Sequence, residues 1–287
     1  MNYRHVYHAG NFADVLKHAV LALVIEHLKQ KPSPFRVIDT HAGAGLYDLS
    51  SEEAQKTGEW RDGIGRLFGT TLPQDIAEIL EPYLKAVRQG QADNAIAQYP
   101  GSPVLARRLL RRGDVLAANE FHPEDRELLK ELFARDAQTK VLEIDAWMAL
   151  KALLPPKERR GVVLIDPPFE KPGEFQRLIE GLAAAQRRFA TGTVIVWYPV
   201  KDLRAVERFR RDAAALGFTK LYAAELVVGP VRSEGELMGT GLLIVNPPFT
   251  LPAKIERLLP FLAQTLARGA GATSRAEWLA GEHVTSS

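Results

Sequence analysis

The chain has 287 residues, of which 46% are hydrophobic and 25% charged, a composition typical of a globular protein that excludes extensive disorder. The formal net charge of +2 permits contact with nucleic acid without requiring it, and the absence of cysteine excludes disulfides, thiolate nucleophiles and cysteine-ligated zinc. No apolar run approaches the roughly 20 residues that span a bilayer, and the first residues lack the apolar region of a signal peptide, so we expect a cytoplasmic protein without a membrane segment.

The N-terminal segment, YRHVYHAGNFADVLKH, gathers polar and aromatic side chains around a predicted helix that begins near Asn11. Two interpretations of its polar face are open. The face is solvated, or it closes over a cofactor and contributes Lys17 and His18 to it. In the second case Tyr3 and Arg4 would reach a nucleic-acid substrate. The spacing of the three histidines does not put them on one helix face, so no metal site is predicted.

The next apolar run, in FRVIDTHAGAG at residues 35–45, predicts a strand that ends in a glycine turn. Gly43 and Gly45 let the backbone bend tightly and approach a ligand, because no Cβ intervenes. The full G-x-G-x-x-G fingerprint of dinucleotide-binding proteins is absent, so the turn alone is a weak indication of a cofactor site.

The stretch that follows is too long for an ordinary crossover between strands, and it includes the helical pattern PQDIAEILEPYLKAVRQG. We therefore predict a helical insertion over residues 48–98, which returns through YPGSP to a crossover helix at residues 104–112. The rest of the chain, residues 1–47 and 99–287, would form the principal domain.

Beyond residue 114, short β-rich runs alternate with amphipathic stretches of helical length, a pattern typical of parallel strands joined by crossover helices. The predicted strands cover residues 115–120, 141–145, 161–166, 193–198, 220–228 and 241–246. With the strand before the glycine turn they make seven strands, so the expected fold is α/β and Rossmann-like, with a mostly parallel sheet.

Two acids stand at the ends of neighbouring predicted strands, where ligands of open parallel sheets bind. Glu120 is placed to accept hydrogen bonds from both ribose hydroxyls of an adenosine, and Asp145 to accept one from the adenine amino group. Either acid can instead cap the helix that follows it, and for Asp145 alone the two interpretations are evenly balanced. Together with the glycine turn, the pair favours an adenosine-containing cofactor.

The sequence LIDPPF ends another predicted strand with an acid, two prolines and an aromatic ring. The prolines stop the strand and stiffen the corner, because they lack an amide hydrogen and restrict the backbone. Such a corner suits methylation of an aromatic amine: the Asp166 carboxylate and the Pro167 carbonyl would accept its two N–H groups, and both bonds would strengthen as positive charge develops on nitrogen. Phe169 would stack on the base. The predicted methyl donor is S-adenosylmethionine, and no metal is needed.

A near copy of this motif, LIVNPPF, occurs at residues 243–249. Methyltransferase folds insert one late strand antiparallel to its neighbours, which would point Asn246 at the edge of the sheet opposite the cofactor. We therefore assign the catalytic role to Asp166 and interpret the second copy as a strand stop.

The motifs YRHVYHAGNFADVLKH, DTHAGAG, YPGSP, EFHP, LIDPPF, WYPV and NPPF, in this order, resemble the large-subunit ribosomal RNA methyltransferase J family. That family methylates the exocyclic amine of an adenine in bacterial ribosomal RNA. The resemblance implies a class I S-adenosylmethionine-dependent methyltransferase acting at adenine N6 of 23S ribosomal RNA, with the helical insertion near the substrate mouth. It also implies a monomer that prefers protein-free or early-assembly RNA. DPPF alone also fits DNA adenine methyltransferases, and a noncatalytic RNA-binding assembly factor is a third alternative.

The resemblance assigns roles residue by residue. Asp166 would be the catalytic acceptor, and Tyr3 would contact the RNA. One departure is visible, since Ala146 stands where the family usually has glycine; its backbone amide would still face the adenine if its φ is negative. The residues implied to line the S-adenosylmethionine site are His18, His41, Ser102, Glu120 and Asp145.

Overall fold

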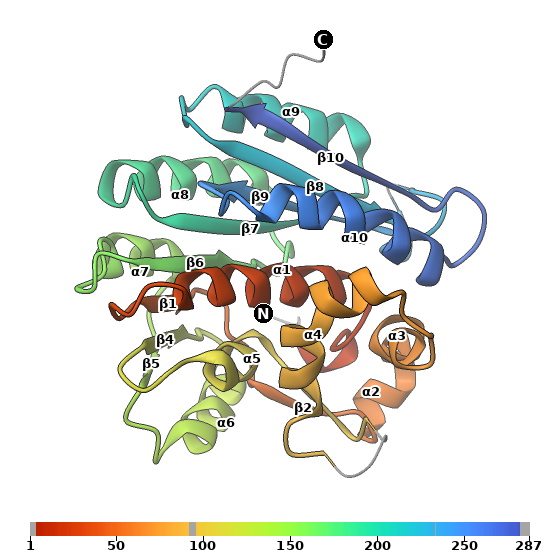
Figure 1. The fold of residues 1–287 in the computed structure, drawn as a ribbon, viewed down its shortest axis with the longest axis horizontal. Helices are drawn as coiled ribbons and strands as arrows, with labels where there is room; N and C mark the ends of the chain where they lie inside the picture. Colours follow the sequence, from red (N-terminus) through yellow and green to blue (C-terminus); the bar gives the residue numbers. More distant parts are fainter. Residues whose placement is uncertain (1–3, 92–95, 233, 282–287) are drawn as a thin grey trace.

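The structure, a computed structural model, describes residues 4–91, 96–232 and 234–281. Its centre is an eight-stranded sheet with the strand order β10-β8-β9-β7-β6-β1-β4-β5 (Figure 1). Strands β5, β4, β1, β6 and β7 are parallel neighbours, whereas β9 lies antiparallel between β7 and β8. The strands are β1 (Arg36–Asp39), β4 (Val115–Asn119), β5 (Thr139–Leu142), β6 (Gly161–Ile165), β7 (Thr193–Pro199), β8 (Leu221–Val227), β9 (Gly239–Val245) and β10 (Thr273–Ala280).

All the predicted strands are present and the antiparallel orientation of β9 is confirmed, but the sheet has eight strands, so the prediction of seven is wrong by one. The missed strand is β10, which pairs antiparallel with β8. Its sequence, TSRAEWLA, carries charged residues on a partly exposed edge, a common feature of edge strands. It therefore lacks the continuous apolar run that marks the central strands.

Both faces of the sheet are covered by helices, which is why the central strands are apolar along their whole length. In β6, Val162 and Leu164 point into one cluster of buried apolar side chains, and Val163 and Ile165 point into another. The first cluster is closed by α1 (Phe12–Lys29), α4 (Gln74–Arg88), α5 (Ser102–Leu109), α6 (Pro123–Phe133) and α10 (Leu251–Thr265). The second is closed by α7 (Ala146–Leu153), α8 (Glu174–Arg188) and α9 (Leu203–Ala214). No described helix has the length and apolar character that crossing a membrane requires.

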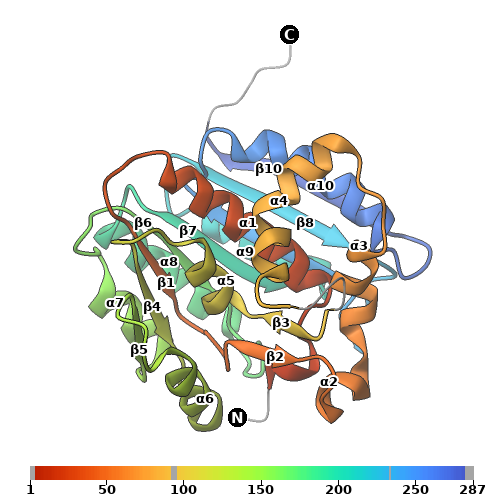
Figure 2. The ribbon, with the colours of Figure 1, turned by 60° about the horizontal axis from the view of Figure 1, so that its bottom comes forward.

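The segment between β1 and α5 is mostly helical. It contains α2 (Glu52–Thr57), η2 (Arg61–Gly65), α3 (Arg66–Phe68) and α4, and it is closed by the short antiparallel strands β2 (Leu46–Asp48) and β3 (Gln98–Pro100). Figure 2 shows these two strands side by side at the base of the insertion. Its buried residues Ile64, Leu80 and Tyr83 belong to the same apolar cluster as α1, so the insertion shares the main core.

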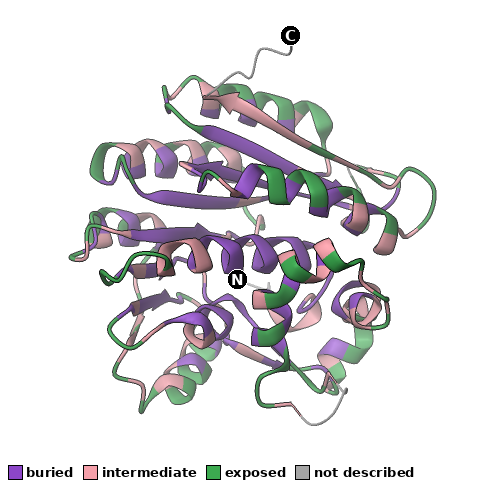
Figure 3. Cartoon of the chain, in the orientation of Figure 1, coloured by how far each residue is buried: buried purple, intermediate pink, exposed green. Residues whose placement is uncertain are grey.

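Helix α1 is the most deeply enclosed helix in the fold. Its N-cap, Asn11, accepts hydrogen bonds through Oδ1 from the backbone N–H groups of Ala13 and Asp14, both at 3.0 Å. Every residue from Phe12 to Ile25 is buried, as Figure 3 shows. The interpretation of a solvated polar face is therefore wrong, and the charged groups of this helix must find partners inside the protein.

Candidate active site

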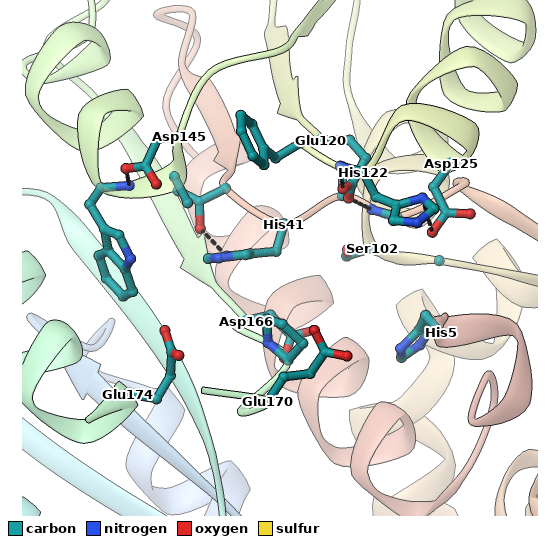
Figure 4. Close-up of a pocket in the computed structure, with 18 of the residues that line it drawn as sticks. His5, His41, Ser102, Glu120, His122, Asp125, Asp145, Asp166, Glu170 and Glu174 are labelled. Carbon is teal, nitrogen blue, oxygen red and sulfur yellow. Dashed lines mark hydrogen bonds and ion pairs between the residues drawn. The ribbon is translucent and has the colours of Figure 1, made fainter. Parts of the chain in front are cut away.

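A cavity of about 710 Å³ opens at the carboxyl ends of the parallel strands, a size typical of ligand sites (Figure 4). It lies beside β1, at the point where the strand order reverses between β6 and β4. The structure brings together there all the residues predicted to bind the cofactor, namely Lys17, His18, His41, Gly43, Ser102, Glu120, Asp145, Ala146 and Asp166.

The glycine turn and Glu120 form one wall of the cavity. Gly43 and Gly45 have φ values of 62° and 85°, in the left-handed region that glycine adopts without strain. The two oxygens of the buried Glu120 accept the backbone N–H groups of Gly43 and His122, each at 2.7 Å. Burial raises the pKa of Glu120, while these two bonds lower it. Each oxygen retains a further lone pair for a ligand hydroxyl.

Replacing Gly43 with alanine is expected to weaken cofactor binding much more than a typical glycine substitution. A Cβ at Gly43 would lie 2.2 Å from the Tyr47 hydroxyl, so the turn or the ring must move. Gly217→Ala is the matched control, because Gly217 also has a positive φ of 78° but nothing lies within 4 Å of its Cβ position. Calorimetric titration with S-adenosylmethionine should show loss of affinity in Gly43→Ala alone. Equal affinities in the two variants would contradict this role of the turn.

Asp145 both caps α7 and faces the cavity. Its Oδ1 accepts the backbone N–H groups of Trp147 at 3.0 Å and Met148 at 3.1 Å, so the capping interpretation is confirmed for this oxygen. Within the described chain, Oδ2 has no hydrogen bond and is available to a ligand. Ala146 begins α7 and is not among the residues with positive φ, so the condition set for its backbone amide is met.

Asp166 ends β6 and is joined to α1 by a chain of ion pairs. Its Oδ2 lies 2.5 Å from Nζ of Lys17, and that ammonium also lies 2.8 Å from Oδ1 of Asp14. Oδ2 of Asp14 in turn accepts the backbone N–H of Gly10 and contacts Nε2 of His5, both at 2.9 Å. Burial lowers the pKa of Lys17, but the charges of the two carboxylates outweigh it and raise that pKa above its usual value. Lys17 is therefore a permanent cation between two acids.

Two histidines of the cavity are neutral. Burial lowers the pKa of His18 to about 3, and its Nδ1 lies 2.7 Å from the Tyr99 hydroxyl. Burial likewise lowers the pKa of His41 to about 4, and its Nδ1 lies 2.8 Å from the Thr40 hydroxyl. Neither ring can therefore supply a positive charge near neutral pH.

Asp39, at the end of β1, lies beside several of the predicted site residues. Its Oδ1 accepts the backbone N–H of His41 at 3.2 Å, whereas its buried Oδ2 has no hydrogen-bond partner in the described residues. Burial raises its pKa to about 7; a hydrogen bond from Ser102 opposes that rise, and the charge of Asp166 adds to it.

Phe169 does not line the cavity in this structure. Its φ is 52°, an unusual value for a bulky residue, and its ring packs edge-on against Phe175 and Trp197 at centroid distances of 5.0 and 5.8 Å. Pro168 lines the cavity, whereas Pro167 is buried behind it. The stacking of Phe169 on a base thus stays a prediction that requires the ring to turn.

The two N-terminal residues predicted to contact nucleic acid have different outcomes. Tyr3 lies outside the described residues. Arg4 lies outside the cavity wall, with its Nη1 3.9 Å from Glu53 of α2 and 3.8 Å from Glu124 of α6. It thus bridges the insertion and the principal domain at one side of the cavity, and its contact with RNA stays a prediction.

Several lining residues were missed by the sequence analysis. Phe121, whose side chain is 60% exposed, and Trp147 line the cavity next to the acids at the ends of β4 and β5. The Trp147 ring lies 6.1 Å from that of His41. A signal was available, because an aromatic residue follows each acid within two positions. His5 was also missed as a lining residue, and its pairing with Asp14 depends on the packing of the N-terminal segment.

The cavity carries an excess of negative charge. Six acidic side chains and three lysine or arginine side chains line it. The acidic ones are Glu120, Asp125, Asp145, Asp166, Glu170 and Glu174, and the basic ones are Lys17, Lys171 and Arg177. Such a lining favours a cationic ligand and disfavours phosphate. This charge, the acceptors of Glu120 and Asp145, and the aromatic wall therefore fit the sulfonium, ammonium and adenosine groups of S-adenosylmethionine.

The second NPPF motif lies at the opposite edge of the sheet, as predicted. Val245, the last residue of β9, pairs with Val194 near the start of β7. Asn246 follows with a φ of 48°, and its Nδ2 donates to the carbonyls of Ala190 at 2.8 Å and Gly192 at 3.0 Å. Its side chain ties the strand end to the preceding loop and is remote from the cavity.

The chain is similar over nearly its full length to proteins of one family. A family model described as ribosomal RNA large subunit methyltransferase D, RlmJ, matches residues 32–280. The chain is 40% identical over 282 residues to ribosomal RNA large subunit methyltransferase J of Escherichia coli strain K12, a match that covers 98% of this chain and 100% of that protein. It is also 40% identical over 284 residues to the protein of the same name from Haemophilus influenzae, with coverages of 98% and 100%.

A solved structure shares this architecture. A Legionella pneumophila protein superposes with a TM-score of 0.85 at 33% sequence identity, covering 94% of this chain and 98% of that one. The match thus extends over nearly the whole of both chains. We conclude that this protein, with its α/β methyltransferase fold, belongs to the large-subunit ribosomal RNA methyltransferase J family.

Proposed function

We propose that the protein transfers a methyl group from S-adenosylmethionine to the exocyclic N6 amine of an adenine in 23S ribosomal RNA. The main support is the position of Asp166. Its carboxylate is paired with Lys17 and lines a cavity that suits the positively charged S-adenosylmethionine. The names of the curated relatives supply the class of RNA. The protein would act in the cytoplasm, where bacterial ribosomal RNA is assembled.

The cofactor would be held by groups that the cavity already presents. Glu120 would accept the ribose hydroxyls through its remaining lone pairs, and Oδ2 of Asp145 would accept the adenine amino group. When bound, S-adenosylmethionine supplies an electrophilic methyl group on a sulfonium. The acidic lining would favour that cation, and Phe121 and Trp147 would shield the adenine from water.

Asp166 would act on the amine of the substrate. The lone pair of an adenine N6 is delocalised into the ring, so the nitrogen becomes nucleophilic only when its hydrogens are drawn out of the ring plane. One Asp166 oxygen is held by Lys17, which leaves the other to accept one N–H group. The Pro167 carbonyl would accept the second, and both bonds would strengthen as positive charge develops on nitrogen. Lys17 would thus be a positioning residue, and Phe169 would stack on the base after turning toward the cavity.

The preferred substrate would be protein-free RNA. An adenine must leave its stack to reach a carboxylate inside a cavity, and this costs a few kcal/mol that flexible RNA reduces. We also propose that the protein acts as a monomer, as its resemblance to the family implies.

The test is transfer of tritium from methyl-labelled S-adenosylmethionine to three substrates: protein-free 23S ribosomal RNA lacking modifications, intact large subunits, and double-stranded DNA. We expect rapid labelling of the protein-free RNA only, with the label recovered as N6-methyladenosine after digestion. Equal labelling of intact subunits would contradict the substrate preference, and labelling of DNA alone would contradict the assignment to RNA.

A further inference from the structure

The second NPPF motif carries an exposed aromatic ring that the catalytic site does not use. Phe249 is 79% exposed, the highest value among the large hydrophobic side chains of the described residues. Its ring meets that of His27, near the end of α1, edge-on at a centroid distance of 5.8 Å. Exposing a phenylalanine costs hydrophobic stabilisation, and a ligand that covered the ring would recover it.

Three cations belong to the same region as this aromatic pair. Lys31 follows His27 by four residues, Lys254 follows Phe249 by five, and Arg160 donates a hydrogen bond to the carbonyl of Leu28, the residue after His27. Burial lowers the pKa of His27, and the charges of these three residues lower it further. Arg160 is held by backbone acceptors, donating to the carbonyls of Ser33 at 2.5 Å and Leu28 at 2.8 Å. Among the described residues, none of the three cations has an acidic partner within ion-pair distance.

We propose that Phe249, His27, Lys31, Arg160 and Lys254 form an accessory site for unpaired RNA at the edge of the sheet opposite the catalytic cavity. We call these five residues the accessory RNA site. A nucleotide base would stack on Phe249 while the cations bind the flanking phosphates. The inference rests on the proposed function, because it takes the substrate to be RNA.

The charge distribution of the protein supports this assignment. The catalytic cavity has more acidic than basic side chains, so it repels phosphates and needs cations elsewhere to hold the RNA. Two of the arginines in α5 and the loop after it are paired with acids, Arg107 with Asp136 and Arg111 with Asp114. A protein partner fits less well, because a protein interface needs a broad apolar centre and Phe249 is a single exposed ring among cations.

The experiment measures binding of a fluorescein-labelled 20-nucleotide oligouridine to the full chain by fluorescence anisotropy, without S-adenosylmethionine. Phe249→Ala should weaken binding about fivefold or more, as expected for loss of one stacked base. Leu203→Ala is the matched control, because Leu203 is 58% exposed on α9 and has no part in the site. It should bind as the wild type does. A double change, Lys31→Ala with Lys254→Ala, should make the slope of log affinity against log salt less steep by about 1.4.

Two further measurements keep the outcome clear. An oligouridine with one 4-thiouridine, irradiated on the wild type, should crosslink to a peptide that contains residues 246–254. With 23S ribosomal RNA, Phe249→Ala should raise the KM and leave kcat unchanged. The accessory RNA site would be overturned if Phe249→Ala bound oligouridine as tightly as the wild type, or if crosslinks were confined to the catalytic edge of the sheet. A protein partner would then be the better explanation of the exposed ring. If the wild type binds oligouridine through this site but methylates no RNA, the proposed function fails and the site stands.

Discussion

The Asp166→Ala variant is expected to lose about 100- to 1,000-fold in kcat while its affinity for S-adenosylmethionine stays within about threefold of the wild type. The carboxylate acts on the amine only as charge develops in the transition state, so its loss falls on turnover and not on cofactor binding. The fold should survive, because Lys17 keeps its second partner, Asp14, at 2.8 Å. Single-turnover methyl transfer and calorimetric titration measure the two quantities separately.

Two control variants sharpen this result. Asp166→Asn keeps the volume and one acceptor oxygen but removes the charge, so we expect it to retain more activity than the alanine variant. Leu203→Ala, on the exposed start of α9, should be fully active. A weakened cofactor affinity equal to the loss in kcat would show that Asp166 binds the cofactor and does not act on the amine. Unchanged turnover would remove Asp166 from the mechanism.

The Lys17→Met variant is expected to lower the free energy of unfolding by about 3 to 5 kcal/mol, since it leaves Asp14 and Asp166 without their shared cation. Lys17 is only 3% exposed, so its two ion pairs are screened little by solvent. Lys29→Met on the same helix is the matched control: its pair with Glu26, at 2.6 Å, is solvent-accessible and should contribute less than about 1 kcal/mol. Urea denaturation at pH 7 measures both.

The pH dependence of this deficit follows from Asp14. Burial raises the pKa of Asp14, but the neighbouring His5 and the Lys17 ammonium hold it well below its usual range. A carboxylate with a depressed folded pKa contributes stability above its unfolded pKa and loses it as pH falls. The deficit of Lys17→Met relative to the wild type should therefore be largest near neutral pH and shrink as the pH falls and the buried carboxylates of the variant become protonated. A deficit that grows in acid would contradict this ion pair.

The strand ends were predictable from sequence, and the contacts between them were not. Glu120, Asp145 and Asp166 each follow a short apolar run, and parallel strands bring such positions to one edge of a sheet. The pairing of Lys17 with Asp166 joins residues 149 positions apart, and no local pattern specifies it. The burial of α1 was equally hidden, because a helix enclosed on all sides with internal ion pairs has the same sequence as one with a solvated polar face.

Other misses have local physical causes. The edge strand β10 alternates polar and apolar residues with charges on a partly exposed face, a weaker signal than the apolar β6. The motif letters of LIDPPF predicted the position of Phe169 but not the direction of its ring, which depends on a φ of 52° and on contacts with Phe175 and Trp197. Backbone conformations of this kind arise from surrounding packing and not from residue preference.

The enclosure of α1 has a consequence for how the protein is made. This helix is synthesised before β9 and α10, against which it packs and which lie more than 200 residues later in the chain. Its buried Lys17 and Asp14 cannot reach their final surroundings until these later elements have been synthesised. The nascent helix therefore stays exposed to water until then. Its packing against β9 and α10 is expected to be among the last and slowest events of folding.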